Sequence, residues 1–336
     1  MLALVIVVVT ATAAIFLAAT GVDVLVAGRA FAQGAFGSSY AIFSATLVRS
    51  VPLILTGLSV AWAFNAGVFN IGVEGQFLVG ASAATAIALA LPHFGLMTTL
   101  LAMIGGSLGG ALWAAIAAWL RVRFSVLEVI STIMLNFVAI QLVAYLVHGP
   151  LGDPAGVYPQ SPSLPSSIWL PRIVSGSRLH LGFAIAVAAS FVAWYVLSQM
   201  ASGFRIRLVG ANPNAAWVSG GVHVNRVTVG AFLVSGALAG LAGSVEVTGV
   251  TYALYESISP GYGYTAIAVA LLANLNPAGV LVSGIGFGAL EAGAASMQRD
   301  AGVPSVIVWV IEALLILLLA AAQVRLRSQL RSEARA

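Results

Sequence analysis

The chain has 336 residues, of which 60% are hydrophobic and only 7% are charged, and its mean hydropathy is +1.04. A soluble domain carries about 25% charged residues, so this composition excludes a soluble protein and predicts an all-α polytopic membrane protein. The sequence has no cysteine and no lysine. It therefore offers no disulfide, no thiolate metal site and no P-loop, whose motif requires lysine. We expect no metal, no cofactor and no nucleic-acid partner, because the histidines and arginines are scattered along the chain.

About ten apolar stretches approach the roughly 20 residues that cross a bilayer, within a single transmembrane domain over residues 1–336. The first is predicted to stay uncleaved, because no basic segment precedes it. The eighth is short. The predicted spans lie near residues 2–20, 47–64, 74–91, 97–119, 126–147, 180–199, 228–250, 262–275, 278–297 and 304–323.

Arginine distribution predicts the orientation, because cytoplasmic loops are enriched in basic residues. With both termini inside, nine of the fourteen arginines are cytoplasmic, including Arg121, Arg123, Arg226 and those of the C-terminal tail. Residues 149–179 then form an external loop, which holds six of the twelve prolines. Residues 200–227 form the longest internal loop.

The stretch FNIGVEGQ, residues 69–76, places Asn70, Glu74 and Gln76 in a long apolar region. Gly72 and Gly75 flank Glu74, so we predict a broken helix near Asn70–Gly75 close to the inner membrane boundary. Two interpretations stay open: a gate or pathway element, and a structural role. For the second, we expect an ionised carboxylate bonded to the amides of the broken segment.

A second polar set follows in EVISTIMLN. Glu128, Thr132 and Asn136 recur every four residues and therefore share one helix face, with Ser131 beside them. The pattern is typical of a polar packing seam or of a surface that lines a route. Further intramembrane carboxylate candidates are Glu246, Glu291 and Glu312.

A short helix is predicted inside the internal loop, in GANPNAAW. Asn212 is a good N-cap, Pro213 suits the first helical position, and Gly220 or Gly221 can end the helix. This helix is either an ordinary capped loop helix or a docking element for another protein. The candidate docking residues are Arg205, Arg207, Asn212, Pro213, Asn214, Ala215 and Ala216.

Several helices carry Gly-x-x-x-Gly pairs, which let helix backbones approach closely. Contacts within one subunit or a dimer seam would both use them. The pairs are Gly105/Gly109, Gly106/Gly110, Gly236/Gly240 and Gly284/Gly288.

Five stretches in order, from about residue 50 to 320, resemble permease subunits of bacterial ABC importers for branched-chain amino acids, ribose and nucleosides. The nucleoside branch is the most similar. The asparagine–glycine–glutamate motif and the long internal loop are the specific parts. The stretches are FNIGVEGQFLVGA, EVISTIMLNFVA, FRIRLVGANPNAAWVSGGV, SGALAGLAGSVEVTG and GYGYTAIAVALLANLNPAGV.

The resemblance implies a multi-pass protein of the bacterial cytoplasmic (inner) membrane, in contact with lipid, that has no ATPase activity of its own. A second permease, which we expect to be a different chain, would complete the pathway, and an extracytoplasmic binding protein would deliver a small neutral polar substrate. A cytoplasmic ABC ATPase would bind residues 212–219, and Ala216→Arg is expected to abolish uptake. A sugar or branched-chain amino acid permease and an ion-coupled secondary transporter remain alternatives. The latter would keep its uptake without ATP and lose it with a protonophore.

Overall fold

The computed structural model describes residues 23–156 and 158–304, together with isolated positions 11, 14, 15, 17, 18, 21, 310 and 313. The spans predicted at 2–20 and 304–323, Glu312 and the arginines of the tail lie outside the described residues or at their edge. The chain divides into two compact units, residues 1–50 with 285–336, and residues 51–284. The candidate site and the internal loop belong entirely to the second unit.

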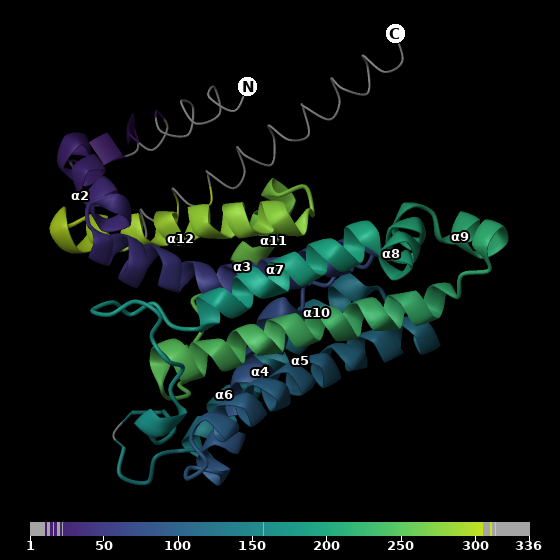
Figure 1. The fold of residues 1–336 in the computed structure, drawn as a ribbon, viewed down its shortest axis with the longest axis horizontal. Coiled ribbons are helices and arrows are strands. Elements are labelled where there is room, and N and C mark those ends of the chain that lie inside the picture. The colour runs from purple at the N-terminus through teal and green to yellow at the C-terminus, as the bar shows by residue number, and fades with distance from the viewer. Residues whose placement is uncertain are drawn as a thin grey trace. The chain divides into compact units, whose positions relative to one another are not determined.

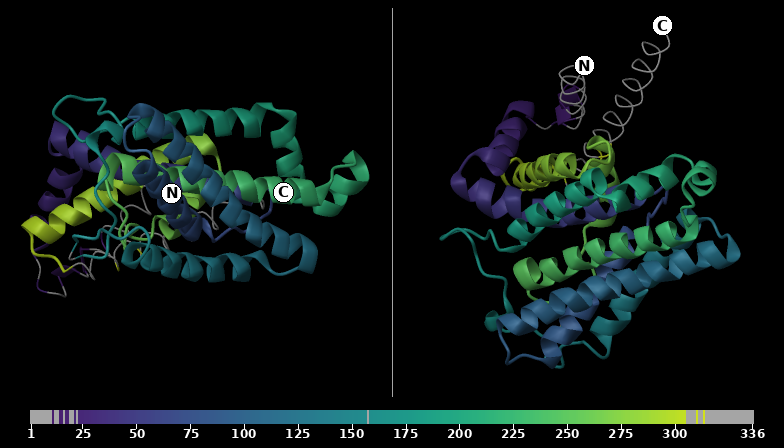
Figure 2. Two further views of the ribbon diagram at one scale, coloured as in Figure 1. Left: turned by 90° about the horizontal axis from the view of Figure 1, so that it is seen from below. Right: turned by 45° about the vertical axis from the view of Figure 1, so that its right-hand side comes forward.

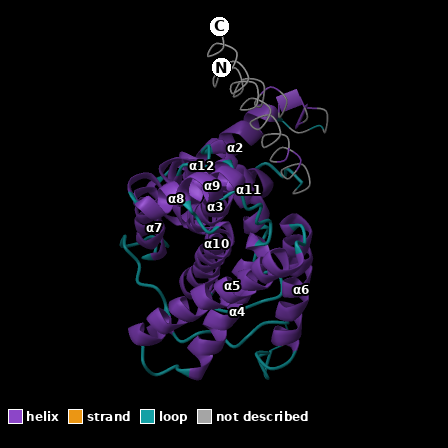
Figure 3. Ribbon diagram, turned by 90° about the vertical axis from the view of Figure 1, so that its right-hand side faces the viewer, coloured by secondary structure: helices purple, strands orange, loops and turns teal. Residues whose placement is uncertain are grey.

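The described part is helical apart from its loops, as Figure 3 shows. Two isolated β-bridges lie in the loops. Seven of its helices are long and apolar enough to cross a membrane. The helices are α2 (Val24–Phe36), η1 (Ala41–Thr46), α3 (Leu47–Asn65), α4 (Val73–Ala90), α5 (Leu96–Phe124), α6 (Glu128–His148), η2 (Ser166–Ile168), α7 (Gly182–Gln199), α8 (Ala201–Ala211), α9 (Pro213–Gly220), α10 (Val224–Glu246), η3 (Val247–Thr251), α11 (Tyr262–Leu272) and α12 (Pro277–Asp300).

Seven of the predicted spans match these helices, and the prediction for residues 262–275 is wrong as a full span. Helix α11 has 11 residues, about 16 Å at 1.5 Å per residue, which is half of a bilayer core. A non-helical segment, residues 252–261, precedes it. Helix α11 is therefore a half-helix.

Within the first unit, α2 was not predicted as a helix. It has 13 residues, and the Asp23 side chain caps it by accepting from the amide of Leu25 at 2.8 Å. In the same unit, Gly34 of α2 lies against Ser296 of α12, so closely that a β-carbon would overlap the serine side chain.

In the second unit, α5 runs beside both α4 and α10, and α6 packs against α4 and α5 (Figure 1). Glycines let the backbones touch. A β-carbon at Gly236 or Gly240 of α10 would meet backbone atoms of Gly106 or Gly110 of α5. These two Gly-x-x-x-Gly pairs therefore form a contact within one subunit.

The other two glycine pairs also make contacts inside the chain. Gly105 and Gly109 lie on α5 against Ile87 and Ala83 of α4. Gly284 approaches Ile54 in the second unit, and Gly288 approaches Ser50 in the first.

The proline-rich segment forms an ordered loop, with η2 as its only helical turn among the described residues. Its amides pair with η3 and the segment that follows it: Leu170 donates to Thr248 O at 2.9 Å, and Ser161 donates to Leu254 O at 2.7 Å. Trp169 stacks on Tyr252, with ring centroids 4.0 Å apart. The loop is thus fixed against η3.

His180 closes this loop. Its ring is 1% exposed, and its Nδ1 accepts from the amide of Gly182 at 3.2 Å. Burial, together with the positive charge of Arg178, lowers the pKa of His180 to about 4. The imidazole is therefore neutral at physiological pH, with its proton on Nε2.

The predicted internal loop is largely helical. Helix α8 was not expected, because its arginines interrupt any apolar period. Helix α9 confirms the predicted short helix: Asn212 caps it by accepting from the amide of Ala215 at 3.0 Å, Pro213 is its first residue, and Gly221 ends it with φ +57°. Helices α8 and α9 lie beyond the ends of α7 and α10 (Figure 2).

Candidate functional site

The predicted helix break is present between α3 and α4, at residues 66–72. Glu74 and Gly75 belong to the first turn of α4. Most of the broken segment is buried, with Val68 and Asn70 both 0% exposed, whereas Phe69 is 53% exposed. Buried backbone outside a helix needs other hydrogen-bond partners, and two sets of side chains supply them.

The first set is the amide pair of Asn70 and Gln76. Asn70 Nδ2 donates to Gln76 Oε1 and Gln76 Nε2 donates to Asn70 Oδ1, both at 3.0 Å. Asn70 Oδ1 also accepts from the amide of Gly72 at 3.0 Å, and Nδ2 donates to Ser235 Oγ at 2.8 Å. Ser235 in turn hydrogen bonds Ser59 of α3 at 2.9 Å. This network ties the break to α4, α10 and α3 without any charge.

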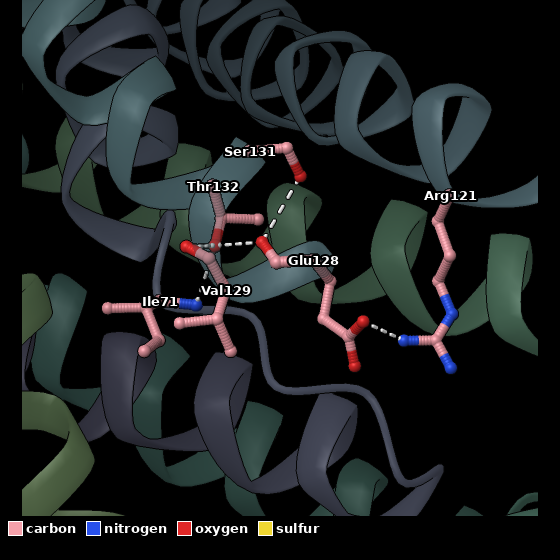
Figure 4. Close-up of polar contacts among 6 residues, drawn as sticks. All are labelled: Ile71, Arg121, Glu128, Val129, Ser131 and Thr132. Atoms are coloured by element: carbon pink, nitrogen blue, oxygen red, sulfur yellow. Dashed lines mark hydrogen bonds and ion pairs between the residues drawn. The ribbon is translucent and has the colours of Figure 1, made fainter. Parts of the chain in front are cut away.

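The second set is the predicted polar face of α6. Asn136 Oδ1 accepts from the amide of Gly75 at 2.8 Å, and its Nδ2 donates to Ile71 O at 2.9 Å. Thr132 Oγ1 accepts from the amide of Ile71 at 3.3 Å (Figure 4). Both side chains are 0% exposed. Two motifs about 60 residues apart in the sequence thus meet, and α6 supplies the partners that the broken backbone lacks.

Glu128 lies at the edge of this face. Its carboxylate forms an ion pair with Arg121, as Figure 4 shows, and its carbonyl accepts from Thr132 Oγ1 at 2.6 Å. The sequence places Arg121 and Arg123 in a loop, but α5 continues through both and ends at Ser125, a left-handed cap with φ +53°. The ion pair therefore joins the end of α5 to the start of α6.

The contacts of Glu74 differ from the prediction. Its carboxylate does not bind the amides of the broken segment; Oε2 accepts from the amide of Gly263, in the first turn of α11, at 2.7 Å. Ser259 Oγ accepts from the amides of Gly261 and Tyr262, both at 3.1 Å. Together the two side chains cap α11. The amide partners that we expected of Glu74 belong to Asn70, Thr132 and Asn136.

Helix α11 separates Glu74 from Asn65. The other end of α11 leads to Leu275, whose carbonyl accepts from Asn65 at the end of α3. Glu74 contacts the opposite end of this half-helix, about 16 Å away. Glu74 and Asn65 therefore contact opposite ends of α11, and the position of Glu74 near the inner membrane boundary stays a prediction.

Glu246 does not join this group. It is 4% exposed and lies at the C-terminal end of α10, next to η3, eleven residues beyond Ser235. The docking residues form a separate set on α8 and α9: Arg205, Arg207, Asn212, Pro213 and Asn214 are exposed, and Ala215 is half-buried. Ala216 is 0% exposed, so its methyl group packs within the chain and cannot contact a partner. The expected reason for Ala216→Arg to block docking is therefore wrong.

Glu74→Leu is expected to destabilise the protein by about 1–3 kcal/mol, the cost of leaving a buried amide without a partner, here that of Gly263. Glu74→Gln keeps an oxygen acceptor at the same distance from the backbone, so the stability of this variant should be close to that of the wild type. Thermal unfolding of the purified variants checks both. If Glu74→Leu were as stable as wild type but altered which ligand is transported, Glu74 would belong to the substrate route instead.

The described part has seven helices long enough to cross a membrane, together with a broken helix and a half-helix that the Glu74–Gly263 hydrogen bond joins, and this arrangement is typical of transporters. The comparisons specify the kind. Residues 42–321 match the model of the family described as branched-chain amino acid transport system / permease component, and the chain belongs to that family. It is accordingly a multi-pass membrane permease component.

Curated relatives cover most of the chain. It is 38% identical to the guanosine ABC transporter permease protein NupP of Bacillus subtilis, over 92% of this chain and 89% of NupP. It is 39% identical to the glucose ABC transporter permease protein TsgB13 of Haloferax volcanii, over 81% of this chain and 74% of TsgB13. It is 33% identical to the nucleoside ABC transporter permease protein NupB of Lactococcus lactis, over 85% of this chain and 80% of NupB.

The two bacteria each hold a second, less similar permease. NupQ of B. subtilis is 27% identical over 74% of this chain and 79% of its own, and NupC of L. lactis is 28% identical over 72% and 78%. No solved structure matches the chain.

Proposed function

We propose that this chain is the permease subunit of an ATP-driven importer of nucleosides. The observation that carries the proposal is its near full-length similarity to a guanosine permease, together with 33% identity to a nucleoside permease from another genus. The second candidate substrate is glucose, which the similarity to an archaeal glucose permease favours. A route with few charges suits either neutral ligand.

Uptake of radiolabelled guanosine by cells that express the chain with its ATPase and binding protein tests the proposal. We expect that unlabelled nucleosides compete with this uptake, that glucose does not, and that the uptake stops when ATP is depleted. Competition by glucose alone would make the chain a sugar permease. Uptake that survived ATP depletion and collapsed with a protonophore would make it a secondary transporter.

The second permease of the complex is proposed to be a different chain. This proposal is supported by the two bacteria that each hold one permease similar to this chain at 33–38% and another at 27–28%. Two differently tagged copies of this chain, purified together with the ATPase in a transport-competent complex, would refute it.

The ATPase is proposed to dock on α9, beside the exposed arginines of α8. Trp217 and Val218 are 58% and 81% exposed, and Arg205, Arg207 and Asn212 flank them at the same end of the unit. Exposed apolar side chains surrounded by polar ones are typical of a protein interface. The docking surface is therefore the Trp217–Val218 face of α9, and Ala216 supports it from within.

The substrate route is proposed to pass the exposed side of the break. Non-helical backbone at membrane depth faces protein or water and not lipid, and here Phe69 and Tyr264 are 53% and 44% exposed. Tyr264 Oη accepts from Asn136 at 3.4 Å. Behind this surface, Asn70, Gln76, Thr132 and Asn136 hold the segment in shape.

A further inference from the structure

The internal loop touches the helix break directly, at two glycines. A β-carbon on Gly210, in the last turn of α8, would overlap the carbonyl oxygen of Asn65 and lie 2.9 Å from the amide nitrogen of Gly67. A β-carbon on Gly67 would lie 3.1 Å from the α-carbon of Gly210. Gly67 itself has φ +71°, a conformation that favours glycine. Two backbones are thus in contact with no side chain between them.

Asn65 connects this contact to a third element. Its Nδ2 donates to Ala61 O at 2.8 Å and to Leu275 O, in the turn between α11 and α12, at 2.9 Å. Asn274 and Leu275 have φ values of +51° and +60°, which cost energy for residues other than glycine and persist only where the surroundings hold them. One residue therefore touches α8 through its carbonyl and the end of α11 through its side chain.

The two segments that leave Asn65 meet again inside the unit. The broken segment leads from Asn65 to Glu74 in the first turn of α4, and α11 leads from Leu275 back to Gly263. Glu74 and Gly263 hydrogen bond at 2.7 Å. Through α11, a helix of about 16 Å, Asn65 is thus connected to the N-termini of both α4 and α11.

The junction has free space on one side. A cavity of about 310 Å³ borders it. Movement of α8 into this space requires no repacking of a filled core. The cavity is lined by Asn65, Leu197, Ser198, Arg207, Asn274, Leu275, Asn276 and Pro277.

We propose that Asn65 and Gly210 are positioning residues that transmit movement of α8 to the two buried helix starts at Glu74 and Gly263. They neither bind the ATPase nor touch substrate. Gly210 keeps the backbone of α8 in contact with the break, and Asn65 ties the break to α11. This inference rests on the proposed docking of an ATPase on α9.

The test uses the complete importer in proteoliposomes, with ATP hydrolysis and guanosine uptake measured on the same sample. For Gly210→Ala we expect the ATPase to stay bound, while uptake per ATP hydrolysed falls at least about fivefold, the lower end of coupling between sites. Asn65→Ala removes the bond to Leu275 O without adding bulk and should lower the same ratio. Gly230→Ala is the matched control, because a β-carbon there meets nothing within 4 Å.

The ratio separates transmission from a merely structural role, since fewer folded complexes lower uptake and hydrolysis together. An unchanged ratio in Gly210→Ala would overturn the proposal, and if that variant failed to fold, an unchanged ratio in Asn65→Ala would do so. If the docking proposal were wrong, the result would be different, because the Val218→Asp variant would still bind the ATPase. A lowered ratio in both junction variants, with Gly230→Ala at the wild-type value, supports the assignment.

Discussion

Replacing Gly240 with valine is expected to prevent the folded permease from accumulating in the membrane. Gly240 lies where α10 meets both α4 and α5. A β-carbon there would overlap Gly106 O and lie 3.0 Å from the α-carbon of Gly110, and one on Gly80 of α4 would overlap Gly240 itself. The obstructing atoms are backbone, so no side chain can turn away. Overpacking of this kind costs about 1–3 kcal/mol or more, a large part of the stability of a typical protein.

The measurement is the yield of detergent-extracted protein that elutes as a single species, with its thermal unfolding temperature. Gly230→Val, on the same helix, is the matched control, since its side chain enters open space. We expect the control to retain near wild-type yield. Equal yields and unfolding temperatures for the two variants would show that the backbones at Gly240 are not in contact.

The contact among α4, α5 and α10 could be predicted from the sequence only in part. Gly-x-x-x-Gly spacing identifies helices that can approach closely, but the same spacing serves contacts inside a subunit and between subunits. That Gly106 and Gly110 face Gly236 and Gly240 follows only from the topology. Hydropathy, in contrast, predicts seven of the spans, because a bilayer-crossing helix needs its own run of apolar residues.

Helices that lack a bilayer-length run of apolar residues were not predicted. Helix α8 contains Arg205 and Arg207 among apolar residues with no clear period, and α2 is too short to cross a bilayer. Helix α11 was mistaken for a span because its apolar run continues through the turn at Leu275. A run of apolar letters does not reveal where left-handed residues such as Asn274 end a helix.

In the candidate site and the internal loop, local features could be predicted from the sequence and long-range contacts could not. The start and end of α9 were predicted because capping acts over three residues, from Asn212 to Ala215. The partners of Asn70 and Glu74 were not predicted. Ser235 lies 165 residues from Asn70, and Gly263 lies 189 residues from Glu74. An apolar sequence marks its polar residues as important, and only the fold shows which of them meet.

Val218→Asp is expected to abolish ATP-driven uptake while leaving the permease folded. Val218 is 81% exposed on α9 and lies beside Trp217, so an aspartate costs the free permease little. In an interface with the ATPase, the carboxylate would be buried without a partner, at a cost of about 3–5 kcal/mol. Since about 1.4 kcal/mol is a tenfold change in affinity, ATPase binding should weaken by about 100-fold or more.

Co-purification of the ATPase with tagged permease, together with uptake in proteoliposomes, measures the effect. Ala201→Asp adds the same charge at an exposed position at the start of α8, where a helix N-terminus favours it, and should retain both activities. Ala216→Arg is the informative third variant. Because Ala216 is fully buried, we expect it to disturb α9 itself and to lower the unfolding temperature, which Val218→Asp leaves unchanged. Retention of the ATPase by Val218→Asp, with normal uptake, would place the docking surface elsewhere on the chain.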